Sequence, residues 1–487
     1  MKKFWMMLVF SLLFTLAACT DKPIPTTDPI TPLPNEELPV DNSRLHNPFG
    51  FSSLIITDRS TYQNTITVVQ NEVEFLDALM DSTVKVIRIE QDLSLGSKTV
   101  SEALAQVGKS LSTYSNVYRA HSRQPLTHPT LMETGVGQIK IIDRSDLMIY
   151  SETGIKIKHA NIQIERASNI VIRNLHVSEL WEWDEYSEGQ YKRNDWDYFS
   201  LKDVNGVWFD HITFDQVYDG VIDLREHAQN VTLSWSKLNF TPNDFVGTQI
   251  DYLENNRSTH PYYDGLRTEG ISVEDLKVFA SFQKKGFNLG NTTDGTGFED
   301  ITMTFHHLEV YNLMDRMPRL RKGDVHLYHM ILDNTLLYQT RLKLNSPNLS
   351  FVNQGLVSTE GGSILLENSI YKFVTTPIKN HQDDDPDVKY TGSYQVINSE
   401  LVQANRTYFG SSTDRNSLWI HAGANAALPY HMRNYDSIPY AYALEDVFYL
   451  TETFEDYPTG AQTIEDFDWL YVDVTRSTIA TGKYVKQ

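Results

Sequence analysis

The sequence is short of cysteine and of basic charge. It contains one cysteine, Cys19, in 487 residues, so the folded region has no disulfide and must be stabilised by burial of apolar side chains. The 63 acidic residues outnumber the 42 lysines and arginines, which gives a formal net charge of -21. Such a chain lacks the basic surface that sequence-independent nucleic-acid binding requires, and we expect no nucleic-acid partner.

The sequence also lacks an apolar run long enough to span a membrane comfortably. The run Phe4–Leu16 has 13 residues, and no later segment is longer than a signal-peptide core. It follows Met1-Lys2-Lys3 and ends in Leu16-Ala17-Ala18-Cys19. This pattern resembles a bacterial lipoprotein signal in which Cys19 is lipidated, and an ordinary secretory signal is the alternative. In both cases we expect an exported protein, secreted or held at the cell surface, with membrane contact only through a lipid at Cys19.

The region after the signal divides into two parts. Residues 20–45 are rich in proline and threonine and lack hydrophobic periodicity, which is typical of an extended tether. We therefore assign a lipoprotein signal peptide to 1–19, a tether to 20–45 and one folded domain to 46–487. The hydrophobic content of 40% and charged content of 22% are those of a globular protein.

Short strand-like runs recur along the folded region with polar residues between them. They alternate aliphatic and polar residues with a period of two, and clear examples begin at residues 169, 206, 230, 300 and 324. The starts at 206 and 230 are 24 residues apart, as are those at 300 and 324. A repeat of roughly 20–30 residues made of strands without intervening helices indicates an all-β parallel solenoid. A β-sandwich with uneven loops is the alternative.

Two segments stand apart from this repeat. Residues 71–79 begin with Asn71 and continue with early acidic residues and helical apolar spacing. This predicts a helix that caps the open N-terminal end of the solenoid. Residues 243–270 contain few aliphatic alternations and many polar and aromatic residues, and predict an excursion between two coils.

Four aspartates have the spacing of a shared site. Asp195 and Asp197 are at i and i+2, hence on one face of a strand. Asp219 and Asp223 are at i and i+4 and would also share a face if extended. From 197 to 223 is 26 residues, about one coil, and neighbouring coils lie about 4.8 Å apart. The carboxylates would then form an oxygen-rich pocket of the kind that binds Ca²⁺; ordinary solvent-facing acids are the alternative.

A cluster of positive charge follows, against the acidic balance of the chain. Within seven residues the sequence places Arg316, Arg319, Arg321 and Lys322. Concentrated cations of this kind favour recognition of carboxylates, to which arginine presents a planar fork. A solvated turn or an intramolecular ion-pair cluster is the alternative.

Taken in order, these segments resemble the signatures of the pectate lyase family, polysaccharide lyase family 1. The resemblance rests on residues 171–176, 207–211, 219–223, 231–235, 301–307 and 316–326, and spans roughly residues 70–400. It implies a right-handed single-stranded parallel β-helix and an enzyme that cleaves polygalacturonate, an acidic plant polysaccharide, by β-elimination. The chain departs from the family pattern at His306-His307-Leu308 and His329-Met330, positions that serve packing.

The resemblance also implies roles for individual residues. The calcium ligands would be Asp195, Asp197, Asp219 and Asp223. The base would be Arg316, and Lys285 and Arg321 would contact the substrate carboxylate, with Lys284 as the alternative lysine. Adjacent strand residues point to opposite faces, so we expect structural roles for His306 and His307 rather than a shared metal. We expect a monomer.

These residue types suit β-elimination. Removal of the C5 proton of a galacturonate places charge on the C6 carboxylate, which accepts it only when cations neutralise it. Calcium on the aspartates, with Lys285 and Arg321, would neutralise that group and would bridge an acidic protein to an acidic substrate. Arginine is an unusual base because its free pKa is above roughly 12, and neighbouring cations would favour its neutral form. We therefore expect an alkaline optimum and loss of activity with a chelator.

Three other functions fit parts of the sequence. A hydrolase on a similar solenoid would use Asp219 and Asp223 as acid and base, but would leave Arg316 and Arg321 without a role. A non-catalytic surface protein would bind polysaccharide without turnover. A lyase for methyl-esterified pectin would not need the calcium aspartates, all of which are present.

Overall fold

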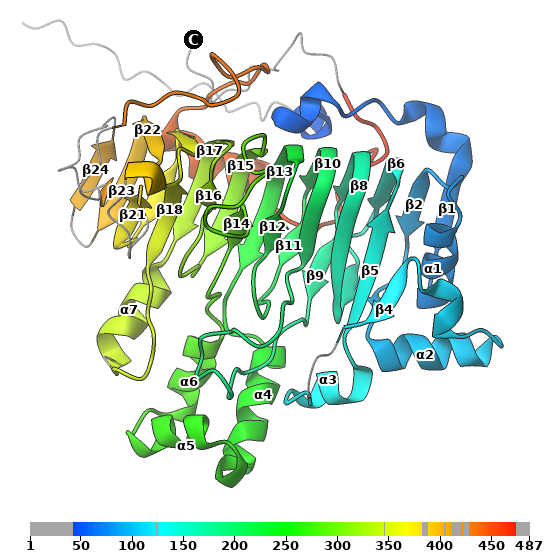
Figure 1. The fold of residues 1–487 in the computed structure, drawn as a ribbon, viewed down its shortest axis with the longest axis horizontal. Coiled ribbons are helices and arrows are strands. Elements are labelled where there is room, and N and C mark those ends of the chain that lie inside the picture. The colour runs from blue at the N-terminus through cyan, green and yellow to red at the C-terminus, as the bar shows by residue number, and fades with distance from the viewer. Residues whose placement is uncertain are drawn as a thin grey trace, which may run out of the picture. The chain divides into compact units, whose positions relative to one another are not determined.

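Parallel strands stacked coil upon coil form a right-handed single-stranded parallel β-helix (Figure 1). The computed structural model describes residues 42–121, 125–344, 346–381, 388–403, 406–410, 420–421 and 428–473. Residues 41–487 form a compact unit, whereas Cys19 and residues 20–41 of the expected tether lie outside the described residues. Within the described part of the chain, no helix is both long and apolar enough to cross a membrane.

The coils contribute strands to three sheets. The first contains β1 (Ile66–Val69), β2 (Val86–Ile89), β6 (Ser145–Tyr150), β8 (Ala160–Arg173), β10 (Phe199–Asp210), β13 (Ala228–Asn239), β15 (Thr302–Tyr311), β17 (Asp324–Asp333), β19 (Ser363–Glu367) and β22 (Ser393–Ile397). The second contains β5 (Gly137–Ile142), the first halves of β8 and β10, β12 (Ile222–Leu224), β14 (Phe287–Leu289), β16 (Arg319–Arg321), β18 (Gln354–Thr359), β21 (Thr376–Lys379) and β25 (Ile420–His421). The third contains β3 (Leu93–Ser94), β7 (Lys156–Lys158), β9 (His176–Ser178), β11 (Thr213–Phe214), the last residues of β13, β15 and β17, β20 (Ile370–Lys372) and β23 (Ser399–Gln403). Two further strands add to these sheets in antiparallel orientation. They are β4 (Tyr118–Ala120), which pairs with β5, and β24 (Arg406–Gly410), which pairs with β23.

Inward-facing positions of the second sheet align from coil to coil. Ile162, Phe199, Ile222 and Phe287 occupy one register position on successive strands, and each is at most 3% exposed. Burial of one such side chain stabilises the fold by about 1.5–3 kcal/mol. These apolar ladders hold the coils together without a disulfide. The parallel β-helix predicted from the sequence is confirmed.

The bend that follows the first sheet uses a left-handed backbone at seven successive coils. The equivalent residues have φ between 41° and 55° and are Asn174, His211, Trp235, His307, His329, Asn368 and Asn398. Asparagine tolerates this conformation well. The bulkier rings of the middle coils stack instead, and the centroids of Trp235 and His307 are 3.9 Å apart. The histidines that depart from the family pattern therefore serve a packed ladder at a strained bend.

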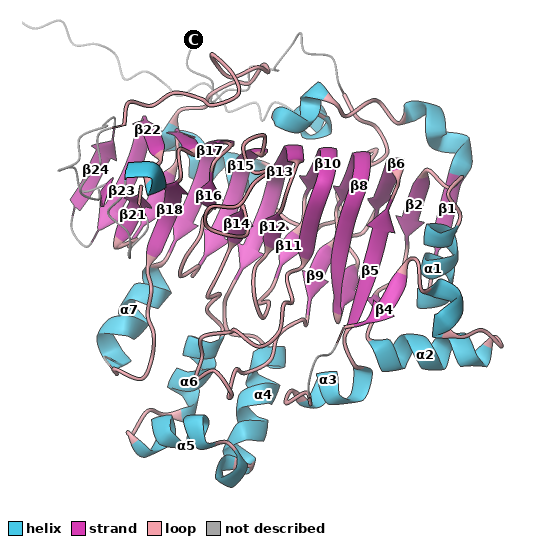
Figure 2. Cartoon of the chain, in the orientation of Figure 1, coloured by secondary structure: helices cyan, strands magenta, loops and turns pink. Residues whose placement is uncertain are grey.

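Helices lie outside the sheets (Figure 2). They are α1 (Glu72–Met80), α2 (Ser97–Gln106), α3 (Pro129–Thr134), α4 (Asp244–Asn255), α5 (Pro261–Thr268), α6 (Val273–Ala280), α7 (Thr335–Leu344) and α8 (Leu450–Asp456). Helix α1 forms where the sequence predicts it, at the β1 end of the solenoid (Figure 1), and the Asn71 side chain caps it by accepting from the backbone N–H of Glu74 at 3.0 Å.

The excursion expected near 243–270 consists of the helices α4, α5 and α6, inserted between β13 and β14 (Figure 1). Asn243 caps α4 by accepting from the N–H of Val246 at 3.0 Å, and Ser272 caps α6 by accepting from the N–H of Asp275 at 3.1 Å. Such caps are polar residues, which is why the segment resembles a loop in sequence. Pro261 begins α5, where its missing N–H costs nothing.

Segments near both ends of the described chain lie against the first sheet. Arg173 of β8 is fully buried there, donates to Asp210 at 2.7 Å and donates to the carbonyls of Trp469 and Tyr471 at 2.9 Å each. Leu45 is only 2% exposed, although residue 45 falls within the expected tether. Contacts with the β-helix therefore begin before residue 46.

Candidate active site

The four aspartates converge at the coils of β10 and β12. Asp223 is the central residue of β12, and Asp219 lies in the turn before it. The expectation of a strand at Asp195 and Asp197 is wrong, because both lie in an irregular segment that leads into β10. Asn161 fixes this segment by donating to the carbonyl of Asp197 at 2.5 Å.

Gly220 creates the space between two of the carboxylates. A Cβ at this position would lie 2.8 Å from Oδ1 of Asp197 and 2.8 Å from Oδ1 of Asp223. Its backbone N–H donates to Oδ1 of Asp197 at 2.8 Å. The two oxygens thus border one small volume that any other residue would fill with carbon.

The aspartates repel one another. Burial, followed by the charges of Asp223 and Asp219, raises the pKa of Asp197 well above its usual value. Burial and the charge of Asp219 raise the pKa of Asp223 to about 6. The Oδ1 of Asp223 has no hydrogen-bond partner among the described residues. Clustered carboxylates that disfavour each other's charge, one of them with an unpartnered buried oxygen, are the donor set that a hard cation such as Ca²⁺ stabilises, so these residues fit a calcium ion.

Lys285 faces this cluster, and Lys284 does not. The Nζ of Lys285 lies 2.5 Å from Oδ1 of Asp219 and 2.9 Å from the carbonyl of Tyr191. The Nζ of Lys284 donates to the carbonyl of Ser350 at 2.8 Å and sits 4.3 Å from the centroid of a phenylalanine ring. Of the two lysines, geometry therefore brings Lys285 to the aspartates.

Arg316 precedes β16 in a left-handed conformation with φ of 68°. Its side chain is 21% exposed, and its buried Nε has no hydrogen-bond partner among the described residues. Its positive charge opposes the rise in the pKa of Asp223. Arg316 therefore presents beside the carboxylate cluster a guanidinium whose Nε is not hydrogen-bonded to a described residue and lies 3.9 Å from Asp315.

Arg319 and Arg321 point the same way from β16, because they are two residues apart on a strand. The guanidinium of Arg321 donates to Oδ1 of Asn288 at 3.0 Å and to the carbonyl of Gly290 at 2.6 Å. Burial and the neighbouring Arg319 lower the pKa of Arg321 to about 10. Lys322 instead bonds Glu299 at 2.7 Å. Three of the four cations in the run thus belong to this site.

Asn288 links the acidic and basic halves, and the sequence did not single it out. Register places Asp223, Asn288 and Arg319 side by side on β12, β14 and β16. The Nδ2 of Asn288 donates to Asp223 at 3.3 Å, while its Oδ1 accepts from Arg321. Asn288 and Asp223 are 65 residues apart in the sequence. Aligning the two coils that carry them would have predicted that Asn288 lies beside the aspartates.

The buried histidines near the left-handed bend form no comparable site. His307, His329 and Glu445 place ligand atoms within 4.8 Å of one another, but the guanidinium of Arg44 already bonds both Glu445 and His307. The Nδ1 atoms of His306 and His307 lie 2.8 Å apart, because the bend at His307 turns its ring back. Both of these histidines are buried, consistent with structural roles.

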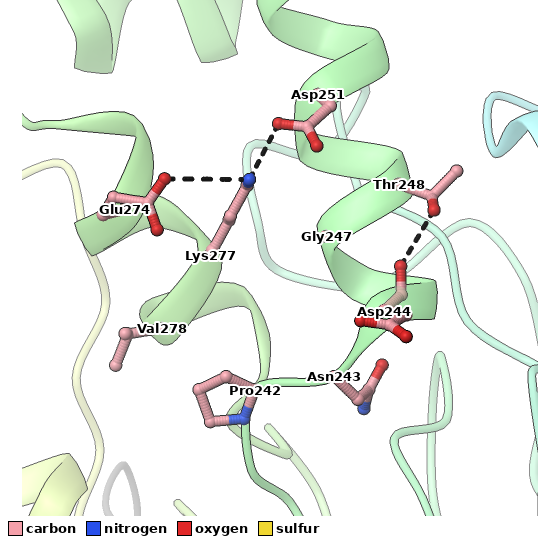
Figure 3. A pocket seen from close by; sticks show the side chains of 9 residues that line it. All are labelled: Pro242, Asn243, Asp244, Gly247, Thr248, Asp251, Glu274, Lys277 and Val278. Carbon is pink, nitrogen blue, oxygen red and sulfur yellow. Dashed lines mark hydrogen bonds and ion pairs between the residues drawn. The ribbon is translucent and has the colours of Figure 1, made fainter.

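A recess of about 450 Å³ lies between α4 and α6 (Figure 3). Lys277 spans it, with its Nζ 2.8 Å from Asp251 and 3.7 Å from Glu274. None of the aspartates or arginines of the cluster lines this recess.

Comparisons with known proteins agree with one another. A family model described as pectate lyase matches residues 139–251. Pectate lyase B of Paenibacillus amylolyticus is 36% identical over 345 residues, which cover 68% of this chain and 85% of that protein. The pectate trisaccharide-lyase of Thermotoga sp. (strain RQ2) is 26% identical over 192 residues, 39% of this chain and 40% of its own length. A solved structure of a pectate lyase from Paenibacillus sp. 0602 matches with a TM-score of 0.79 and 32% identity, covering 88% of this chain and 98% of that one.

Proposed function

The chain belongs to the pectate lyase family of polysaccharide lyases, and from that premise we propose that it cleaves de-esterified polygalacturonate by calcium-dependent β-elimination. One observation carries the proposal. A cluster of four aspartates with raised pKa values for Asp197 and Asp223 adjoins Lys285 and the arginines of β16 within the second sheet. An acidic protein gains a site for an acidic polymer only where such cations gather.

The aspartates Asp195, Asp197, Asp219 and Asp223 would hold the calcium ion. When bound, the ion supplies positive charge that stabilises the negative charge developing on the C6 carboxylate of the substrate. Lys285 and Arg321 add fixed donors for the same carboxylate, and the bonds of Arg321 to Asn288 and Gly290 orient its guanidinium in advance. Because the guanidinium is already oriented, no free energy has to be spent on ordering it during the reaction.

Arg316 is the proposed base. Its Nε makes no hydrogen bond among the described residues, and its ion-pair contact in that part of the chain is a long one, 3.9 Å to Asp315. A neutral Arg316 nitrogen takes the C5 proton, and the electron pair of the C5–H bond becomes the C4–C5 double bond. The bond from C4 to the glycosidic oxygen breaks at the same time, and that oxygen takes a proton from solvent. The products are a saturated chain and a chain with an unsaturated terminal uronate, without uptake of water.

The paired acids do not favour hydrolysis over elimination. A hydrolase with Asp219 and Asp223 as acid and base needs one protonated carboxyl group. With a pKa of about 6, Asp223 is protonated only below about pH 6. Asp219 is bonded to Lys285, and a hydrolase would leave the arginines without a role. The presence of all four aspartates likewise favours a de-esterified substrate over a methyl-esterified one.

The test is the mass of the products formed from a defined oligogalacturonate. Elimination yields products whose masses sum to that of the substrate, one of them carrying the unsaturated sugar. Hydrolysis adds the mass of one water to that sum, and this result would overturn the proposal in favour of the hydrolase.

Export as a lipoprotein is part of the same proposal. The signal at 1–19 would direct lipidation of Cys19, and the tether would hold a monomeric enzyme at the cell surface. Growth with a labelled fatty acid should label the wild-type protein but not a Cys19→Ser variant. Equal labelling of both would rule out the anchor.

A further inference from the structure

Beside the aspartate cluster, on the side away from β16, lies a recess of about 90 Å³. It shares Asp195 and Asp197 with the cluster, and Arg119 and Arg225 also line it. One water occupies about 30 Å³ of liquid, so the recess has the size of a carboxylate group rather than of a sugar ring. Its position makes it a continuation of the proposed active site.

Arg119 is the unusual member of this recess. It lies on β4, the short antiparallel strand beside β5, and its side chain is exposed. No carboxylate of the described residues lies within ion-pair distance of it. Burial and then the charge of Arg119 lower the pKa of Lys140, whose own Nζ donates to a backbone carbonyl at 2.5 Å rather than to an acid. Within the described part of this strongly acidic protein, Arg119 and Lys140 therefore stand together with no carboxylate in ion-pair contact, and the acids nearest to Arg119 across the recess are Asp195 and Asp197.

A buried relay of amides holds Arg119 in place. Its Nε donates to Gln138 at 2.6 Å, Gln138 donates to Asn161 at 2.5 Å, and Asn161 donates to the carbonyl of Asp197 at 2.5 Å. Gln138 and Asn161 are 6% and 1% exposed. The relay fixes one edge of the guanidinium and leaves its terminal nitrogens without a partner among the described residues. A fixed arginine with free donors suits a carboxylate.

The register of the second sheet explains why a polymer would reach this point. One outward row runs through Gln163, Ser200, Asp223, Asn288 and Arg319 on successive strands. Strands in a sheet are about 4.8 Å apart. Gln163 is therefore two strands, or roughly 10 Å, from Asp223 on one side, as Arg319 is on the other. A chain laid along this row meets Arg316 and Arg321 at one end and Arg119 at the other.

We infer that this recess binds the carboxylate of a second uronate residue of the substrate, and that Arg119 determines the affinity for longer acidic chains. The inference rests on the proposed function for the nature of the polymer. Asp195 and Asp197 would oppose such an anion, but Asp195 lies 3.7 Å from Arg225, and the proposed calcium ion would neutralise the other acids. Arg119 touches substrate away from the scissile bond, so it acts on binding and not on the elimination step.

The test compares Arg119→Gln with a matched control, Arg341→Gln. Arg341 is an exposed cation of α7 that does not line the recess, so both variants lose the same charge. Binding of hexagalacturonate and of digalacturonate would be measured by calorimetry with calcium, together with initial rates on both. We expect Arg119→Gln to weaken hexagalacturonate binding by about five- to tenfold, the loss of one charge-assisted contact at a partly exposed site. Digalacturonate binding, the rate at saturation and the control variant should not change.

Three results separate the inference from the proposed function. Partial recovery of hexagalacturonate binding in Arg119→Lys would support recognition by charge. Equal binding by Arg119→Gln and Arg341→Gln would overturn the subsite even if the wild-type protein is a lyase. Weaker hexagalacturonate binding in Arg119→Gln without any unsaturated product from the wild type would refute the lyase proposal and leave the subsite standing.

Discussion

The self-repulsion of the aspartates predicts that Asp223→Asn stabilises the protein in the absence of calcium. Burial and the charge of Asp219 raise the pKa of Asp223 from its usual 3.8 to about 6 in the folded protein. This change in pKa corresponds to at most about 3 kcal/mol, because the Asp223 side chain is only partly buried. Asparagine keeps the shape and removes the charge, so it removes this cost.

The direction in which stability changes with pH follows from proton binding by the folded and unfolded states. Between pH 4 and 6 the folded state holds a proton on Asp223 that the unfolded state has lost, so the free energy of unfolding falls as the pH rises. The wild type and Asp223→Asn should therefore be equally stable near pH 4. Above pH 6 the variant should be more stable by up to about 3 kcal/mol, which for a folded unit of this size is about 3 °C in melting temperature.

The assay is thermal unfolding of both proteins at pH 4 and pH 8, with EDTA and with calcium. Calcium should stabilise the wild type by about 3 kcal/mol at a hundredfold excess over its dissociation constant, and should stabilise the variant less. The matched control is Asp300→Asn, a partly exposed acid bonded to His227 at 2.8 Å away from the cluster. An Asp223→Asn variant no more stable than the wild type at pH 8 in EDTA would refute the self-repulsion.

Three further predictions concern the same site and its support. Gly220→Ala places a Cβ 2.8 Å from two carboxylate oxygens and should abolish calcium binding measured by calorimetry, whereas Gly247→Ala, with nothing within 4 Å, should bind calcium normally. Lys285→Met should lower kcat/KM on polygalacturonate by at least about a hundredfold, the loss of a donor to developing charge, whereas Lys284→Met should not; equal effects would contradict the assignment. Asp210→Asn leaves a fully buried arginine without its counter-ion and should cost about 3–5 kcal/mol in urea unfolding; a loss below about 1 kcal/mol would count against it.

Much of the fold was predictable because a solenoid repeats one short pattern. The runs of alternating aliphatic and polar residues that begin at 206 and 230 form parts of β10 and β13, which pair in register. The helix after Asn71 was predictable because its cap and its apolar face lie close together in the sequence. Local patterns decide these elements.

Features that depend on several distant coils were not predictable. The segment at 195–197 reads as a strand, but bonds from Asn161 and His121 to its backbone carbonyls hold it as an irregular segment. The helices α4 and α6 were missed for a local reason instead, because they begin at polar caps that resemble loop residues. Asn288 gains its place only from pairing with β12 and β16, which no single stretch of sequence reveals.

The most direct test of the proposed mechanism is the ultraviolet absorbance of unsaturated product formed from polygalacturonate by the wild type and by Arg316→Lys, each with calcium and with EDTA. We expect a steady rise only for the wild type with calcium. Arg316→Lys should lose orders of magnitude in rate at an unchanged melting temperature, because a lysine nitrogen does not reach the same position as a guanidinium. A near-wild-type rate in Arg316→Lys, or a wild-type rate that survives EDTA, would contradict the mechanism.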